Sequence, residues 1–340
     1  MSRLISIITP FYNASKFLKR TYESVINQKY SNWEWICVND CSTDNTLEML
    51  EELSKNDSRI KVISRKNNGG NAASSINYGL KHCNGQYVQI LGHDDVLSKD
   101  LLIEISKRID ETEADVIIPD AEVINDGVDY YTSIKMVGVK RDDKWIDSPE
   151  SRTVVLTSRE AVKLSLDWRI HAWATYNKEL LEKVGGFDEE GMNGDEYSAR
   201  VLFLNANKIV FSRGTYFYMQ NKNSISQKLS TRYFDVFKTE DKILKLLINN
   251  HFEKAERKLC KSRLLNLFID RKLKYYIHKN EFSKEENLLI EEFLKYAQTL
   301  VLKYAFIDYF KIYFDITKYK IYYMLWKNIG KKLEKRHYII

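Results

Sequence analysis

Residues 6–46 read SIITPFYNASKFLKRTYESVINQKYSNWEWICVNDCSTDNT and contain the pattern of a strand, a helix and a second strand in close succession. The apolar, β-branched run that ends at Phe11 is typical of a buried central strand. The next segment places apolar residues at helical spacing: Phe17, Leu18, Tyr22, Val25 and Ile26. The run WEWICVND, residues 33–40, then predicts a second buried strand.

The alternation of strands and helices continues to about residue 120. We expect further strands at 59–64, 86–91 and 114–120, and further helices at 42–55, 70–83 and 98–111. Ser42 or Thr43 is the expected N-cap of the helix at 42–55. Such alternation predicts an α/β fold with a mostly parallel central sheet and helices on both faces. We therefore expect one α/β domain over residues 1–230 and a separate helical region over residues 231–340.

The composition of the 340-residue chain is that of a globular protein, with 44% apolar and 29% charged residues. Its four cysteines form no CxxC pair, so neither a zinc ribbon nor a disulfide framework is indicated. The chain also lacks the roughly 20 consecutive apolar residues that a membrane span needs. We expect a cytoplasmic protein.

The positive charge is concentrated after residue 230. Residues 231–340 hold 24 Lys and Arg against 14 Asp and Glu, and residues 303–340 hold nine against three, interleaved with aromatic residues. Basic helices with aromatic borders bind anionic bilayers, which would place the protein peripherally on the inner face of the cytoplasmic membrane. A helical bundle that packs on the first domain, or that forms a homo-oligomer, explains the same composition equally well. No nucleic-acid-binding module is found, so a nucleic-acid partner is not expected.

Polar residues and glycines follow four consecutive predicted strands. The sequences at these strand ends are TPFYN, NDCSTDN, RKNNGGN and GHDD. Ligands of open α/β sheets bind at the carboxyl ends of the strands, so the sequence predicts a binding site there. The alternative is that Asp40, Asp44 and Asp95 are turn or cap residues. Asp44 in particular fits the start of a helix.

The opening block resembles the family 2 glycosyltransferases with the GT-A fold. The resemblance continues through NNGGNAASSINYGL and GGFDEEGMNGDEYSARVLFL and covers roughly residues 3–225. It implies an inverting transfer of a sugar from a nucleotide-diphosphate donor, with a UDP-sugar expected, to a growing bacterial surface glycan or a lipid-linked acceptor. The products expected of such an enzyme include lipopolysaccharide and capsule. A non-catalytic nucleotide-sugar-binding protein that kept the fold is the alternative.

Carried onto this sequence, the resemblance implies a set of donor-binding residues at the strand ends. Asp40 is expected on the base or ribose, and a carboxylate can accept hydrogen bonds from both. Asn71 would offer a further amide group. The full set expected at the donor is Pro10, Tyr12, Asn13, Asp40, Asn68, Gly69, Gly70, His93 and Asp94.

The resemblance also implies a divalent metal, Mn²⁺ or Mg²⁺, at an Asp-x-Asp motif after the fourth strand. In this sequence Gly92 replaces the first Asp, and Asp94 matches the second. One or two carboxylates, together with diphosphate oxygens and water, suffice for such a metal. We expect Asp94 as the main ligand with Asp95 beside it, and His93 in an exposed loop or at the donor.

The pair Asp195 and Glu196 is expected to supply the general base. An inverting transferase must remove a proton from the acceptor hydroxyl, and the family carries its base at this segment. The alternative is a helix start, where acidic residues are favoured. We favour Asp195 as the base.

Two further segments resemble acceptor-side and diphosphate-side loops of the family. Trp173 is expected to stack on an acceptor sugar, although its spacing from Tyr176 also suits a core position, and His171 is expected to be structural. The loop after residue 218 offers further donor contacts: Gln220, Asn223 and Ser224.

Overall fold

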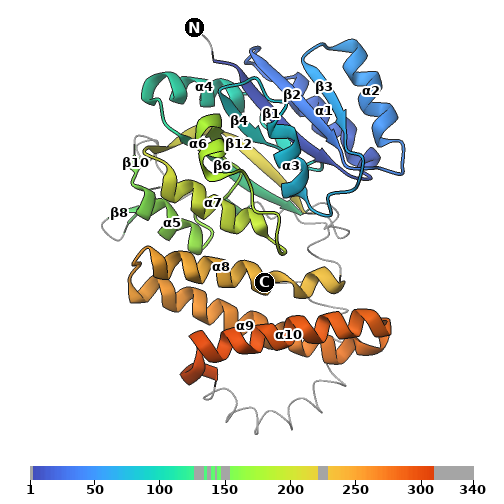
Figure 1. Cartoon of the computed structure of the whole chain (residues 1–340). Coiled ribbons are helices and arrows are strands. Elements are labelled where there is room, and N and C mark those ends of the chain that lie inside the picture. The colour runs from blue at the N-terminus through green and yellow to red at the C-terminus, as the bar shows by residue number, and fades with distance from the viewer. Residues whose placement is uncertain are drawn as a thin grey trace. The chain divides into compact units, whose positions relative to one another are not determined.

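The structure is a computed structural model of the whole chain, shown in Figure 1, and it describes residues 3–125, 134–135, 139–141, 144–146, 154–220 and 229–309. The chain divides into two compact units, residues 1–227 and residues 228–340. The first unit is an α/β domain and the second is helical, so the predicted fold class is confirmed.

A mixed sheet forms the centre of the first unit. Its strand order is β10, β12, β6, β11, β4, β1, β2, β3, and β5 and β7 extend it by pairing with β12 and β6. The strands are β1 (Ile5–Phe11), β2 (Trp33–Asn39), β3 (Ile60–Ser64), β4 (Tyr87–Ile90), β5 (Val96–Leu97), β6 (Val116–Asn125), β7 (Ile134–Lys135), β10 (Val155–Leu156), β11 (Thr175–Asn177) and β12 (Ile209–Gln220). A separate hairpin joins β8 (Val139–Arg141) to β9 (Lys144–Ile146).

The expectation of a mostly parallel sheet holds for the ladder β3, β2, β1, β4, in which every neighbouring pair is parallel. Strand β11 interrupts this pattern because it lies antiparallel between β4 and β6. The sheet continues beyond it with the parallel pair β6 and β12. Four parallel strand ends therefore meet at one edge of the sheet.

Alternate residues of the strands pack against different helices. Ile7, Phe11 and Trp35 are buried in one core with α1 (Ser15–Ile26), α2 (Thr46–Asn56) and α4 (Leu101–Thr112). Ile8 and Val38 face α3 (Ala72–Leu80) instead, where Gly79 comes so close that a Cβ would lie 2.8 Å from Ile8 Cγ2. The remaining helices are α5 (Ser158–Leu166), α6 (Lys178–Val184) and α7 (Gly194–Asn205).

The start of α2 differs from the expected cap at Ser42 or Thr43. The N-cap position is Asn45, and Asp44 supplies the capping carboxylate: its Oδ1 accepts from Thr46 N at 3.1 Å. Its Oδ2 accepts from Ser15 N at 3.1 Å, at the start of α1. Burial acts to raise the pKa of Asp44, but the hydrogen bonds from Thr46 and Ser15 outweigh it and lower that pKa to about 2. Asp44 is thus a helix-start residue that joins two helices.

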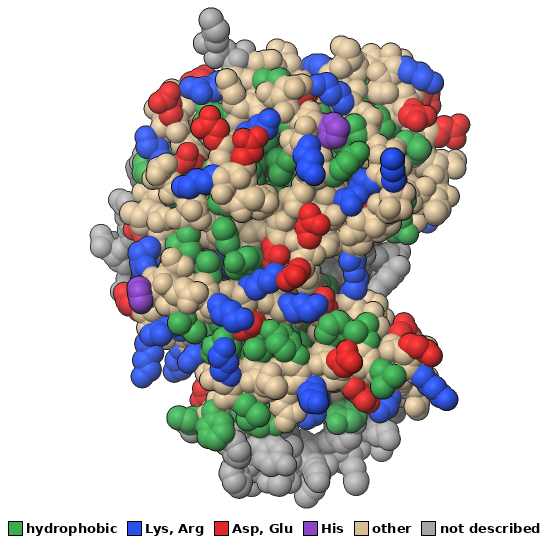
Figure 2. All heavy atoms as spheres, in the orientation of Figure 1, with side chains coloured by type: hydrophobic (Ala, Val, Ile, Leu, Met, Phe, Trp, Pro, Cys, Tyr) green, Lys and Arg blue, Asp and Glu red, His purple; other side chains and the backbone are tan. Residues whose placement is uncertain are grey.

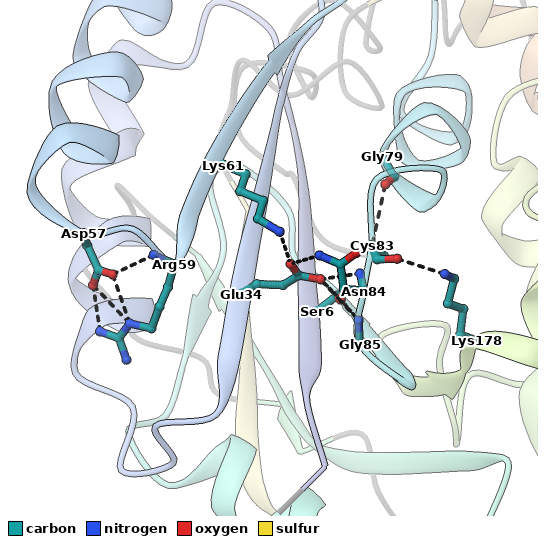
Figure 3. Close-up of polar contacts among 10 residues, drawn as sticks. All are labelled: Ser6, Glu34, Asp57, Arg59, Lys61, Gly79, Cys83, Asn84, Gly85 and Lys178. Carbon is teal, nitrogen blue, oxygen red and sulfur yellow. Dashed lines mark hydrogen bonds and ion pairs between the residues drawn. The ribbon is translucent and has the colours of Figure 1, made fainter.

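A buried polar cluster lies where β1, β2 and β3 begin, at the opposite end of these strands from the polar loops (Figure 3). The Glu34 carboxylate accepts from Ser6 Oγ at 2.6 Å and from Asn84 N at 2.5 Å, and pairs with Lys61 Nζ at 2.6 Å. Burial alone would raise the pKa of Glu34, but these partners lower it below its usual value. Because every partner is in place, the cluster fixes the loop before β4 to the sheet.

The second unit consists of α8 (Val236–Asn249), α9 (Lys254–His278) and α10 (Lys284–Tyr304), with short 3₁₀ helices η2 (Thr231–Phe234) and η3 (Lys279–Glu281). Leu244, Leu264 and Val301 belong to its apolar core. Hydroxyl groups of Tyr296 and Tyr304 donate to Asp241 at 2.9 and 3.0 Å, which ties α10 to α8.

Charged and apolar side chains are mixed on the surface of the helical unit, as Figure 2 shows for one face. Among the described residues, no helix is long and apolar enough to cross a membrane. Residues 310–340, which hold most of the basic and aromatic tail, lie outside the described residues.

Candidate active site

The carboxyl ends of β1, β2, β3 and β4 lie at one edge of the sheet, because the four strands are parallel. In open α/β sheets this edge is where loops and helix starts converge to bind ligands. All the residues expected at the donor lie in or next to the loops that leave these four strands.

The loop after β1 is fixed to the loop after β2 through Asn13. The side-chain oxygen of Asn13 accepts from Thr43 N at 2.7 Å, and its backbone N donates to Ser42 Oγ at 3.1 Å. Asn13 has a left-handed backbone with φ 50°, a conformation that asparagine tolerates better than most residues. Tyr12 beside it is 46% exposed, and Pro10 is half-buried near the end of β1. Tyr12 is therefore available to a ligand, whereas the Asn13 amide oxygen already has a structural partner.

Asp40, after β2, gathers the glycine loop that follows β3. Its Oδ1 accepts from Gly69 N at 2.8 Å and pairs with Arg65 Nε at 3.3 Å. The Asn68 amide donates to the backbone oxygen of Asp40 at 2.9 Å. A Cβ at Gly69 would lie 2.7 Å from Arg65 Nη1, so a larger residue would displace the Arg65 guanidinium. The structure thus brings Asp40, Asn68 and Gly69 together, with Gly70 next in the chain.

The loop after β4, residues 92–95, is attached to β12. The Tyr216 hydroxyl donates to Asp95 Oδ2 at 2.6 Å and accepts from Gly92 N at 3.0 Å. The second carboxylate oxygen of Asp95 accepts from Met219 N at 2.9 Å. Burial, and next the charge of Asp94, raise the pKa of Asp95 to about 7. Asp95 is 3% exposed, so its carboxylate is engaged inside the protein.

Helix α1 supports the same loop from the other side. Arg20 Nη2 donates to the backbone oxygen of Asp94 at 2.8 Å, and Thr21 Oγ1 donates to that of His93 at 2.8 Å. The imidazole ring of His93 lies against Phe17, with 6.1 Å between ring centroids. Asp94 is half-buried. The backbone of residues 93 and 94 is therefore held to α1 by hydrogen bonds to its carbonyl oxygens.

The residues of this loop fit a hard divalent cation only in part. Gly92 offers no ligand, and a Cβ there would lie 2.3 Å from Asp95 Oδ2. Within the described residues no group of three or more His, Cys, Asp or Glu side chains could hold a metal ion by itself. One carboxylate at Asp94 suits Mn²⁺ or Mg²⁺ when diphosphate oxygens and water complete the coordination. These residues therefore fit a divalent metal whose remaining ligands come from the nucleotide diphosphate and water.

Asp195 and Glu196, in the first turn of α7, have different surroundings. Glu196 Oε2 pairs with Nη1 of the buried Arg200 at 2.5 Å, and Arg200 Nη2 donates to Ser165 O at 2.6 Å. The Asp195 side chain reaches solvent, yet the protein around it partly desolvates the carboxylate. This desolvation, and next the charge of Glu196, raise the pKa of Asp195 to about 6. Glu196 thus forms the ion pair with Arg200, and Asp195 does not.

The segment before α7 is attached to α3, which starts at the glycine loop. Asn71 caps α3 through Ser74 N at 2.8 Å, and its Nδ2 donates to Glu189 O at 2.6 Å. The Asn77 amide donates to Phe187 O at 2.7 Å. Asn71 is therefore a capping residue, and the position of Asp195 is coupled to the loop that contacts Asp40.

Trp173 packs against two tyrosines of β12. Its indole ring stacks on Tyr218 at 4.6 Å and on Tyr216 at 5.3 Å between centroids. His171 Nδ1 accepts from Trp173 N at 3.1 Å, and burial lowers the pKa of His171 to about 3. His171 is therefore neutral and structural. Trp173 is only partly buried, so a sugar-stacking role stays a prediction.

Sequence reasoning missed the residues that hold the site in place. Arg65 and Arg200 form ion pairs inside it, and Arg20, Thr21 and Tyr216 hold the loop after β4. Their contacts join residues up to 124 positions apart, so no local sequence pattern predicts them. Gln220 ends β12, and Asn223 and Ser224 lie outside the described residues.

Comparisons with known proteins agree with this geometry. The model of the family "Glycosyl transferase family 2" matches residues 6–185. The glycosyltransferase GlyG of Streptococcus pneumoniae is 30% identical over 66% of this chain and 73% of its own length. GlyA of the same organism is 30% identical over 66% of this chain, but the match covers only 31% of GlyA.

A third relative also has solved structures. TarS of Staphylococcus aureus, a poly(ribitol-phosphate) β-N-acetylglucosaminyltransferase, is 26% identical over 77% of this chain and 43% of its own length. The crystal structure of TarS 1–349 with UDP-GlcNAc superposes with a TM-score of 0.61 and 20% identity, covering 88% of each chain.

The α/β domain has the GT-A fold. The chain belongs to glycosyl transferase family 2 and is a glycosyltransferase. This membership favours the enzyme over the non-catalytic binding protein.

Proposed function

We propose that the chain transfers a sugar from a UDP-sugar, with inversion at the anomeric carbon, to a bacterial surface glycan or a lipid-linked acceptor. The observation that carries this proposal is the difference in surroundings between the neighbouring carboxylates of Asp195 and Glu196. Glu196 is paired with Arg200, whereas Asp195 reaches solvent with a pKa of about 6. A base with a pKa near the working pH is both deprotonated and basic enough to accept a proton.

The nucleotide is proposed to bind at the ends of β1 and β2. Both contacts of the Asp40 carboxylate with Arg65 and Gly69 fall on Oδ1, and we assign Oδ2 to the ligand. A carboxylate oxygen there accepts from a uracil N–H or a ribose hydroxyl. Tyr12, 46% exposed, would cover the base, and UDP-GlcNAc bound to the similar TarS fold supports a uridine donor.

The diphosphate is proposed to lie by the loop after β4. Asp94 would hold Mn²⁺ or Mg²⁺ there, and the metal would supply positive charge to the diphosphate. Asp95 is engaged by Tyr216 and Met219, so we assign it to positioning of the loop and no longer to direct coordination. His93 and Asn68 lie within the loops that would surround the donor.

In the reaction, Asp195 takes the proton of an acceptor hydroxyl as its oxygen bonds to the anomeric carbon. The bond from that carbon to the diphosphate oxygen breaks, and its electron pair leaves with the nucleotide diphosphate. Attack from the face opposite the leaving group inverts the anomeric configuration. Trp173 would stack on the acceptor sugar.

Product analysis tests this proposal. Full-length protein is incubated with a panel of UDP-sugars, Mn²⁺ and a bacterial surface-glycan acceptor, and UDP release and the anomeric configuration of the glycosylated acceptor are measured. We expect turnover of one UDP-sugar, loss of turnover in EDTA and in D94N, and an inverted anomer. Retention of configuration would contradict the assignment of Asp195, and full activity in EDTA would contradict the metal.

A further inference from the structure

The Tyr216 hydroxyl occupies a special place in the first unit, because it bridges two points of one loop. It donates to Asp95 Oδ2 at 2.6 Å and accepts from Gly92 N at 3.0 Å. Tyr216 is 1% exposed and lies in β12, whereas the loop follows β4. One hydroxyl thus holds both ends of residues 92–95.

We propose that Tyr216 is a positioning residue for glycosyl transfer: its hydroxyl sets the conformation of loop 92–95 and so aims Asp94 at the diphosphate. The proposal rests on the donor site described under Proposed function. It assigns to this residue a role that acts through Gly92 and Asp95 and not by contact with substrate.

The geometry explains why this hydroxyl matters more than an ordinary buried hydrogen bond. Asp94 lies between the two attachment points, and from α1 Arg20 donates to the carbonyl oxygen of Asp94 itself and Thr21 to that of His93. The loop is therefore clamped between β12 and α1. Without the Tyr216 hydroxyl, Gly92 N loses its partner and the Asp95 carboxylate keeps only the bond from Met219 N, so one of these three hydrogen bonds to β12 remains.

The glycine at position 92 is also consistent with a loop conformation set by Tyr216. A Cβ at this position would lie 2.3 Å from Asp95 Oδ2, so the side chain that accepts from Tyr216 occupies the space above Gly92. Asp94 is the only carboxylate of the Asp-x-Asp motif in this loop. If the loop moves, no second motif carboxylate can take over as metal ligand. Partners that orient metal ligands typically affect metal affinity or activity by about 10- to 100-fold.

The test measures binding of UDP by isothermal titration calorimetry, with and without Mn²⁺, using full-length protein. The variant is Y216F, and the matched control is Y87F. Tyr87 is also a buried tyrosine, 1% exposed, in the strand that leads to the loop, but its hydroxyl donates to Ala114 O at the far end of that strand. Melting temperatures of both variants show the purely structural cost of losing a buried hydroxyl.

We expect Y216F to weaken Mn²⁺-dependent UDP binding by about 10-fold or more, while Y87F binds as the wild type does at a comparable melting temperature. The double variant D95N/Y216F should lose less than the product of the single losses, because both changes release the same loop. Equal binding by Y216F and Y87F would overturn the role of Tyr216 alone. Wild-type protein that binds no UDP with Mn²⁺ would contradict the proposed donor, and the role of Tyr216 with it.

Discussion

Asp195 and Glu196 show how two neighbouring residues of one type take different roles. In a helix, successive side chains point about 100° apart, so the two carboxylates meet different surroundings. Arg200, one turn later on α7, lies on the face of Glu196 and not on that of Asp195. The sequence predicts that one member of this pair is the base. The contact that distinguishes the two residues is the ion pair of Glu196 with the buried Arg200, which also donates to Ser165 O in α5.

Variants of the pair should behave differently. D195N removes the proposed base, so we expect kcat to fall by about 10²- to 10⁴-fold with little change in UDP-sugar affinity. E196Q breaks a buried ion pair and should mainly lower the melting temperature. Steady-state kinetics and thermal unfolding of both variants check this. Near-full activity of D195N would place the base elsewhere.

The pKa of Asp195 predicts the pH dependence of the reaction. A base acts in its deprotonated form, and desolvation by the surrounding protein raises this pKa to about 6, so kcat/KM should rise with pH and level off above about pH 7. The charge of Glu196 contributes to the raised value, so E196Q should move the rise to lower pH. A pH profile of wild type and E196Q measures both effects. A profile that does not change in E196Q would argue against Asp195 as the titrating group.

At the scale of elements, the loops of the site are fixed by side chains that cap helices and bridge strands. The sequence placed Asp40, Asn68 and Gly69 at strand ends, and parallel pairing explains why they meet. It did not reveal that Asn71 is a cap attached to residue 189, or that Asp95 is held by β12. These contacts join segments that are distant in the sequence. Strand ends, by contrast, can be predicted from the local sequence pattern.

Asp44 offers a test at this scale, because its carboxylate caps α2 and accepts from the start of α1. D44A should lower the free energy of unfolding at neutral pH by about 1 kcal/mol, as loss of a capping side chain does. The folded pKa, about 2, lies below the usual value, so this stabilisation is complete above about pH 4 and is lost as the pH falls toward 2. Urea unfolding of wild type and D44A at several pH values checks this. A difference that stays constant down to low pH would show that the carboxylate charge is irrelevant.

At the scale of the whole molecule, the α/β domain and the change to helices were predictable from hydrophobic periodicity. The antiparallel β11 was not, because three residues between β4 and β6 carry too little pattern to reveal their direction. In the helical unit, the pairing of Tyr296 and Tyr304 with Asp241 also joins distant helices. Composition identified the basic C-terminal region but did not choose between its two uses.

Removal of residues 310–340 should separate those uses. Residues 303–340 hold nine Lys and Arg against three Asp and Glu, with aromatic residues between them. Each basic residue near an anionic bilayer contributes about 1 kcal/mol, so full-length protein should sediment with phosphatidylserine vesicles at low salt and dissociate at high salt. The truncated protein should stay in the supernatant with an unchanged melting transition of the α/β domain, since the buried apolar residues of that domain run from Ile5 to Met219. Vesicle binding that survives truncation would place the membrane contact elsewhere, and a full-length protein that ignores vesicles but loses its dimer on truncation would assign the basic tail to self-association.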